Sequence, residues 1–170
     1  MTSDSAASGT PAARDSKRPA TRSRLRRWGN LLNGATGLGL LTAKLGGATL
    51  EKGPDGLYLA QGYALPFPIA GAFTIGNVII TPRQWTDFGA RWPTVMQHEE
   101  RHSWQWLLWG GPVGFLPAYT VAMGWSWLRT GDRAAANVFE TLADLDLGGY
   151  RKVKPRWQGV RRLLTRTRLR

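Results

Sequence analysis

The only two histidines of the chain, His98 and His102, lie four residues apart, and Glu99 directly follows the first. On a helix this spacing places both imidazoles on one face, a turn apart, within reach of one ion. Neutral imidazole suits Zn²⁺, and the adjacent glutamate projects beside the ion, where it can accept a proton from water that zinc activates. The pattern therefore predicts a zinc site with Glu99 as general base. The plain alternative is a histidine pair on a polar helix surface.

A catalytic zinc site needs a third protein ligand, and with no cysteine and no further histidine this ligand must be a carboxylate. The downstream candidates are Asp132, Glu140, Asp144 and Asp146. Glu140 and Asp144 are again four residues apart in a largely apolar helical segment, so both can face one side, and Asn137 lies on that face too. We expect one carboxylate to bind the metal while the other accepts a histidine ring N–H. An unpartnered buried carboxylate would be costly, which favours explaining both polar pairs together.

These side chains require helices, and the sequence predicts one over residues 93–109. Proline suits its first turn, and a Gly-Gly pair supplies its stop. A last structured helix is expected over residues 133–147, also closed by a Gly-Gly pair. Residues 53–81 are rich in Tyr, Val, Ile, Thr and Phe and are interrupted by Gly and Pro, which is typical of short β-strands. A few short strands followed by a helical metal-binding half predict an α+β fold.

Three features bear on a membrane. Residues 103–128 carry no formal charge, but glycines and prolines interrupt them. We interpret them as the end of the histidine helix and a second apolar helix over 116–128, forming either a core hairpin or one inserted shallowly in a membrane. Seven of the nine tryptophans lie within residues 85–127, and tryptophan suits both cores and membrane interfaces. Arg26-Arg27 and the apolar run after them favour an interfacial helix over a signal peptide.

Positive charge gathers at the two ends of the chain. Residues 1–30 contain seven Lys or Arg and two Asp, a net charge of +5, and residues 151–170 contain nine Lys or Arg and no acid, a net charge of +9. Because the N-terminal segment is also poor in apolar residues, we expect a disordered basic tail over 1–27, a metal-binding domain over 28–150 and a basic C-terminal tail after it. Basic tails favour phosphate-rich partners, either anionic lipid or nucleic acid.

With these residues the chain resembles the zincin metallopeptidases, and more narrowly the gluzincin, or thermolysin-like, pattern. There a His-Glu-x-x-His helix is completed by Glu-x-x-x-Asp on a later helix, and the matching residues are His98, Glu99, His102, Glu140 and Asp144. The resemblance implies a small zincin-like domain in which His98, His102 and Glu140 hold Zn²⁺.

The chain is also similar to small bacterial membrane-associated proteins. In these, His-Glu-x-x-His-x-x-Gln is followed by a Gly/Pro-rich apolar stretch and by Glu-x-x-Ala-Asp, as in residues 98–105, 110–128 and 140–144. The resemblance covers about residues 74–150. It further implies an edge strand beside the metal that holds an extended peptide substrate, and residues 75–81 are the expected strand.

These features predict a zinc-dependent, peptidase-like hydrolase that acts on a peptide or protein substrate. Spacing does not mark the side chain that would stabilise the transition state, and Tyr119, Tyr150 and Arg101 are available for that role. The alternative is a non-catalytic membrane-associated protein whose basic tails bind anionic lipid.

Basic residues on both flanks of the apolar region favour association with the cytoplasmic face of a membrane, with a purely cytoplasmic protein as the alternative. Nucleic-acid binding by the C-terminal tail is disfavoured because no recognisable nucleic-acid fold accompanies it. The sequence does not indicate the oligomeric state.

Overall fold

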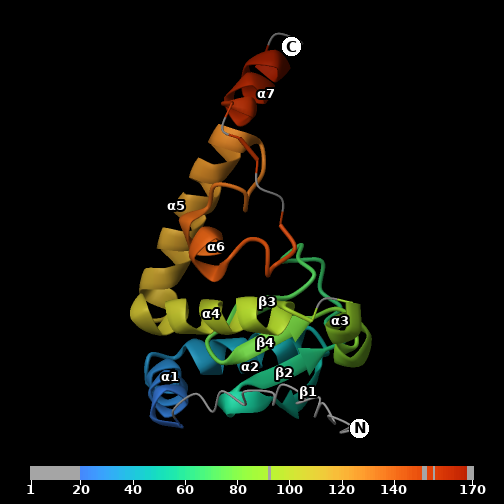
Figure 1. The fold of residues 1–170 in the computed structure, drawn as a ribbon, viewed down its shortest axis with the longest axis vertical. Helices are drawn as coiled ribbons and strands as arrows, with labels where there is room; N and C mark the ends of the chain where they lie inside the picture. The colour runs from blue at the N-terminus through green and yellow to red at the C-terminus, as the bar shows by residue number, and fades with distance from the viewer. Residues whose placement is uncertain (1–19, 92, 151–152, 155, 168–170) are drawn as a thin grey trace, which may run out of the picture.

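The computed structural model describes residues 20–91, 93–150, 153–154 and 156–167 of the 170-residue chain (Figure 1). The fold is α+β, as predicted. The elements in chain order are α1 (Ala20–Leu32), α2 (Ala35–Leu45), β1 (Thr49–Lys52), the single turn η1 (Pro54–Gly56), β2 (Tyr58–Gln61), β3 (Phe73–Ile75), β4 (Val78–Thr81), α3 (Trp85–Arg91), α4 (Val95–Leu108), α5 (Pro112–Thr130), α6 (Val138–Ala143) and α7 (Gln158–Thr167).

The four strands form one sheet in the order β1-β2-β4-β3. Strand β4 pairs parallel with β2 and antiparallel with β3, and all four of its residues are buried. Val78 and Ile80 pack on one face in a cluster with Ala43 of α2, whereas Ile79 packs on the other with Val95 of α4. Because helices cover both faces, β4 is a continuous apolar strand without alternation.

The prediction of one edge strand over residues 75–81 is wrong. The segment divides into the hairpin β3–β4, which turns at Gly76-Asn77, and β3 forms the edge while β4 is interior. Gly76 has a φ of 61°, and a Cβ there would lie 2.5 Å from the Ala35 backbone. Both features require glycine. The edge strand that lies against α4 is therefore β3.

Residues 20–27, which the sequence assigned to a disordered tail, form the first two turns of α1. Arg26 is fully buried, and its Nη1 donates to Asn77 Oδ1 at 3.1 Å and to Ser103 Oγ at 2.9 Å. These bonds join α1 to the hairpin turn and to α4, a role that a basic composition does not reveal. Residues 1–19, the rest of the predicted tail, lie outside the described part of the chain.

The helical half follows the expected order with different bounds. Helix α5 starts earlier than the predicted 116–128 segment and continues through Pro117. Helix α6 is much shorter than the predicted 133–147 helix, because Asp144 adopts a φ of 72° and ends it. None of the described helices is long and apolar enough to cross a membrane.

Helix α4 crosses over the sheet, α5 extends from its end away from the sheet, and α6 lies between them (Figure 1). A core cluster of Trp106 from α4, Phe115 from α5, Phe139 from α6 and Ala35 from α2 joins the four helices. This packing fixes α6 against α4, so that the carboxylate of one can meet the histidines of the other.

Candidate metal centre

The three predicted site residues of α4 are buried. His98, Glu99 and His102 are 1%, 3% and 7% exposed. The first turn of α4 is tied down from outside, because Thr94 Oγ1 donates to the Leu147 carbonyl at 3.0 Å. One turn apart on this fixed helix, the two imidazoles are nearly perpendicular, and their Nε2 atoms lie 3.1 Å apart.

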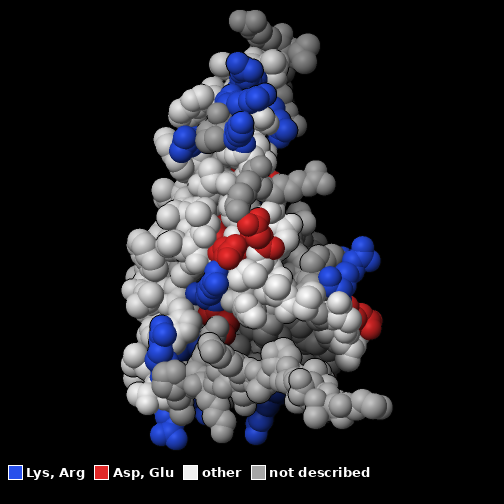
Figure 2. Space-filling view, viewed as in Figure 1, with Lys and Arg blue, Asp and Glu red and all other residues white. Residues whose placement is uncertain are grey.

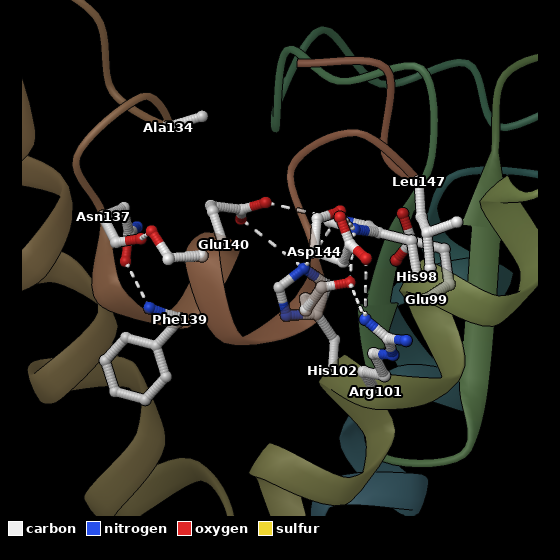
Figure 3. A network of polar contacts seen from close by, with 12 residues as sticks. His98, Glu99, Arg101, His102, Ala134, Asn137, Phe139, Glu140, Asp144 and Leu147 are labelled. Carbon is white, nitrogen blue, oxygen red and sulfur yellow. Dashed lines mark hydrogen bonds and ion pairs between the residues drawn. The ribbon is translucent and has the colours of Figure 1, made fainter. Parts of the chain in front are cut away.

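Helix α6 brings Glu140 to the same point (Figure 3). Asn137 caps α6, since its Oδ1 accepts from the Phe139 N–H at 2.9 Å, and this places Glu140 in the first turn. Glu140 Oε2 lies 3.2 Å from His98 Nε2, and Oε1 lies 3.5 Å from His102 Nε2. One ligand atom from each of the three residues falls within 4.8 Å of the others.

These distances fit a metal ion. Ligand atoms that lie 2.0–2.1 Å from a tetrahedral ion are about 3.3 Å from one another. The two Nε2 atoms are 3.1 Å apart, and they lie 3.2 Å and 3.5 Å from the two different oxygens of the Glu140 carboxylate. Glu140 is 2% exposed, and no described residue donates a hydrogen bond to its Oε2. Two imidazoles and a carboxylate form a donor set that suits a divalent metal such as zinc. His98, His102 and Glu140 can therefore hold a metal ion.

Hydrogen bonds from the outer ring nitrogens set both histidine tautomers. His98 Nδ1 lies 3.1 Å from the Ala143 carbonyl and 3.0 Å from the Asp144 carbonyl, and His102 Nδ1 lies 2.8 Å from Gln105 Oε1. Carbonyl oxygens only accept, so each Nδ1 carries a hydrogen, and a neutral ring then directs its Nε2 lone pair to the centre. Lone pairs that converge on a buried carboxylate repel one another unless a proton or a metal ion lies between them.

The electrostatics of the three residues favour a positive charge at this point. Burial disfavours the charged form of His102, but its hydrogen bond with Glu140 and the charge of that residue raise the pKa of His102 to about 9. Burial also opposes the charge of Glu140, yet the contacts with His102 and His98 hold the pKa of Glu140 below its usual range. The three residues thus favour a positive charge between them, either a proton or a metal ion.

Glu99 lies beside the three residues and is held separately. Thr74 of β3 donates from Oγ1 to Glu99 Oε2 at 2.7 Å. Burial raises the pKa of Glu99, and the opposing influences of His102, Thr74 and His98 do not cancel this rise. A raised pKa makes the Glu99 carboxylate a stronger base than an exposed glutamate, which suits a group that accepts a proton from water.

Two of the three candidates for transition-state stabilisation lie at the centre. The Tyr119 hydroxyl donates to Glu140 Oε1, and the Tyr150 ring lies 5.7 Å from the ring of His98. Burial and the charge of Glu140 raise the pKa of both tyrosines above the usual range, so both keep the hydroxyl proton. Tyr119 uses this proton in its hydrogen bond to Glu140, and Tyr150 keeps a hydroxyl proton that it can donate.

Asp144 contacts His98 through its backbone and not, as predicted, through its carboxylate. The carboxylate instead lies 3.5 Å from Arg101 Nη1, where the two side chains are 43% and 44% exposed. Because α6 ends at this residue, the side chain leaves the helical path that would have directed it inward. Asn137 likewise touches neither histidine and positions Glu140 by capping the helix.

Two further residues support the site without having been assigned a role from the sequence. Gln105 accepts from His102 and donates from Nε2 to the Phe139 carbonyl at 2.8 Å, so it joins α4 to α6. Its position three residues after His102 on the same helix face was the available signal. No sequence signal pointed to Thr74, which donates to Glu99, because spacing alone does not show which strand residue faces α4.

The site is closed over His98. Residues 144–150 lie on this histidine, and a Cβ at Gly148 would be 2.7 Å from His98 Cε1, so the approach depends on glycine. At the edge strand, the Thr74 carbonyl already accepts from Trp106 Nε1 at 2.8 Å.

Comparison of the chain with protein families, with curated proteins and with solved structures found no match. The function has to be inferred from the site itself.

Proposed function

We propose that the protein is a zinc-dependent hydrolase of the peptidase type. The observation that supports this most directly is the convergence of His98 Nε2, His102 Nε2 and Glu140 on one point, with the carboxyl group of Glu99 buried beside it. Bound Zn²⁺ would supply a Lewis acid that polarises a carbonyl group and lowers the pKa of water to about 7.

The residues around the metal ligands have separate roles in the proposed reaction. Glu99 accepts the proton of the attacking water and returns it to the leaving group, while the Thr74 hydroxyl fixes the orientation of the carboxyl group. Gln105 and the carbonyls of Ala143 and Asp144, at the C-terminal end of α6, hold the imidazoles in the metal-binding tautomer. Tyr119 orients Glu140.

The metal part of the proposal is tested by elemental analysis of the purified protein with and without chelator. We expect one zinc ion per chain, removed by the chelator, and we expect His98→Ala to lose it. A protein without bound metal, or zinc uptake that is unaltered in His98→Ala, would rule the site out.

The catalytic part is tested with Glu99→Gln, assayed on a random peptide library with mass-spectrometric detection of cleavage. The variant keeps the zinc ligands and loses the base, so zinc content should be unchanged while hydrolysis falls by about a hundredfold or more. Glu100→Gln, the same change one residue further on α4, is the matched control. Full activity in Glu99→Gln would show that Glu99 is not the base. A zinc-loaded wild-type protein that cleaves no peptide in the library would show that the protein binds metal without being a peptidase.

A further inference from the structure

The exposed face of α5 is apolar along its whole length. The exposed positions recur with helical spacing and are Val113, Leu116, Pro117, Thr120, Val121, Gly124 and Trp125. Val113 is 87% and Val121 is 73% exposed. The one polar side chain, Thr120, donates its hydroxyl to the Leu116 carbonyl at 2.7 Å, so it has no unmet donor. The outer face of a surface helix is ordinarily charged or polar, and α5 inverts this pattern.

The apolar surface extends beyond α5. Leu108 and Trp109 at the end of α4 are 77% and 50% exposed, and Val138 and Leu142 of α6 are 54% and 66% exposed. Between α5 and α6 runs an open groove of about 800 Å³, lined by Trp109, Val121, Trp125, Val138 and other residues without charge. Contiguous exposed apolar surface of this kind marks an interaction site.

Positive charge adjoins one end of this surface. Helix α7 packs against α5 and carries the exposed arginines Arg161 and Arg162. Arg162 Nη1 donates to the carbonyl of Gly131, the C-cap of α5, at 3.2 Å, and the exposed Arg156 donates its backbone N–H to the Arg129 carbonyl at 3.0 Å. Figure 2 shows basic side chains gathered over α7, with uncharged surface along the outer side of α5. The Trp125 and Trp157 rings, 5.9 Å apart, connect the apolar and basic regions.

We propose that the α5 face, defined as the exposed residues of α5 with Leu108, Trp109, Val138 and Leu142, docks on an anionic phospholipid bilayer. In this arrangement α5 lies in the plane of the interface, acyl chains contact the α5 face and its groove, and the α7 arginines contact lipid phosphates. Trp109 and Trp125 sit where an apolar ring and a polar N–H are both satisfied.

Charge favours lipid over a second copy of the chain. A two-fold interface places the same surface on both partners, so the arginines of α7 would need acids on or beside the α5 face. The acids nearest to it in sequence are already engaged: Glu140 is buried at the metal centre, and Asp144 lies 3.5 Å from Arg101 Nη1. Asp132, after the end of α5, accepts through Oδ1 from the N–H groups of Ala134 and Ala135. An anionic membrane supplies the missing counter-charge together with an apolar phase.

The experiment is vesicle flotation of the full chain with phosphatidylcholine alone or mixed with phosphatidylglycerol, over a range of salt concentrations. We expect flotation with the anionic vesicles that weakens as salt rises. Val121→Glu/Trp125→Glu should lower binding by about tenfold or more, because it places two charges in the apolar contact. Arg161→Glu/Arg162→Glu should lower binding to anionic vesicles by roughly tenfold or more.

Ile69→Glu is the matched control, because Ile69 is 86% exposed and lies in the loop between β2 and β3, outside the α5 face. It should bind as the wild type does, and circular dichroism should show all variants folded. Wild-type protein that does not float, or a Val121→Glu/Trp125→Glu variant that floats normally, would overturn the proposal. A wild-type dimer that ignores vesicles and dissociates in that variant would assign the face to self-association. None of these outcomes depends on the metal.

Discussion

Two clusters of buried polar side chains flank α4, and they are built differently. On the side of α1, Arg26, Asn30 and Ser103 are 0% and Asn77 is 1% exposed. Arg26 donates to Asn77 Oδ1, to Ser103 Oγ and to the Asp55 carbonyl at 2.9–3.1 Å, and Asn30 Nδ2 donates to the Ser103 carbonyl at 2.8 Å. The Arg26 Nη and Asn30 Nδ2 donors of this α1 cluster meet neutral oxygen acceptors within the protein, and its charged group is itself a cation, so it does not attract a metal ion.

On the side of α6 the balance is reversed. The two Nε2 atoms and the carboxylate of Glu140 converge within 3.1–3.5 Å, and the Nδ1 hydrogens of both rings are used outward. Burial of polar groups is therefore common to both sides and does not identify a functional site. A surplus of acceptors that only a cation can satisfy does identify one, and the α6 side of α4 has this surplus.

The largest effect is expected for Glu140→Gln, which keeps the shape of the side chain and removes its charge. An amide is a poor zinc ligand, so zinc affinity should fall by more than about a hundredfold. This exceeds the loss of affinity that follows removal of a residue that only hydrogen-bonds to a metal ligand. Competition with a chromophoric chelator measures the affinity. Unchanged zinc affinity would show that the metal, if bound, lies elsewhere.

Arg26→Ala acts on the other cluster and should leave zinc affinity unchanged. It leaves the Asp55 carbonyl and the Ser103 hydroxyl with fewer donors in a buried space, so the free energy of unfolding should fall by about 3 kcal/mol. Urea denaturation followed by circular dichroism measures this, with Arg24→Ala, an exposed position of α1, as control. A specific loss of zinc from folded Arg26→Ala would erase the distinction between the two clusters.

The sequence was most informative where chemistry depends on spacing within one helix. His98 and His102 are four residues apart, and this alone predicted that their rings share a face. Glu140 was the carboxylate chosen to join them, and the structure brings all three together. The histidine helix was also placed within two residues of its observed ends, because Pro93 and Gly110 mark them.

The sequence was least informative where a role depends on contacts between distant segments. Arg26 lies in a basic, tail-like stretch, and only the packing of α1 against Asn77 and Ser103 makes it a core residue. The turn at Gly76-Asn77 was hidden in an apolar run, although Gly-Asn between two such runs is a hairpin signal. The end of α6 at Asp144 likewise required a positive φ that no spacing predicted.

Gln105→Ala tests whether the hydrogen bonds that orient the histidine ligands contribute to zinc affinity. The substitution leaves the His102 Nδ1–H without its acceptor and frees the link to the Phe139 carbonyl, so zinc affinity should fall by about 10- to 100-fold. Gln97→Ala, an exposed glutamine of the same helix, is the matched control. Equal affinity in both variants would mean that the histidine orientation is fixed by α4 alone.

The smallest effect is expected for Asp144→Asn, although sequence spacing placed this carboxylate beside the ligands. The exposed pair with Arg101 contributes less than about 1 kcal/mol to the stability of the fold. Asparagine also tolerates the positive φ of this position, so the backbone carbonyl that accepts from His98 stays in place. Zinc affinity should thus remain as in the wild type, measured by the same chelator competition. A fall comparable to that of Gln105→Ala would mean that the carboxylate turns inward when the metal binds, and that the α6 side of the centre reorganises around the ion.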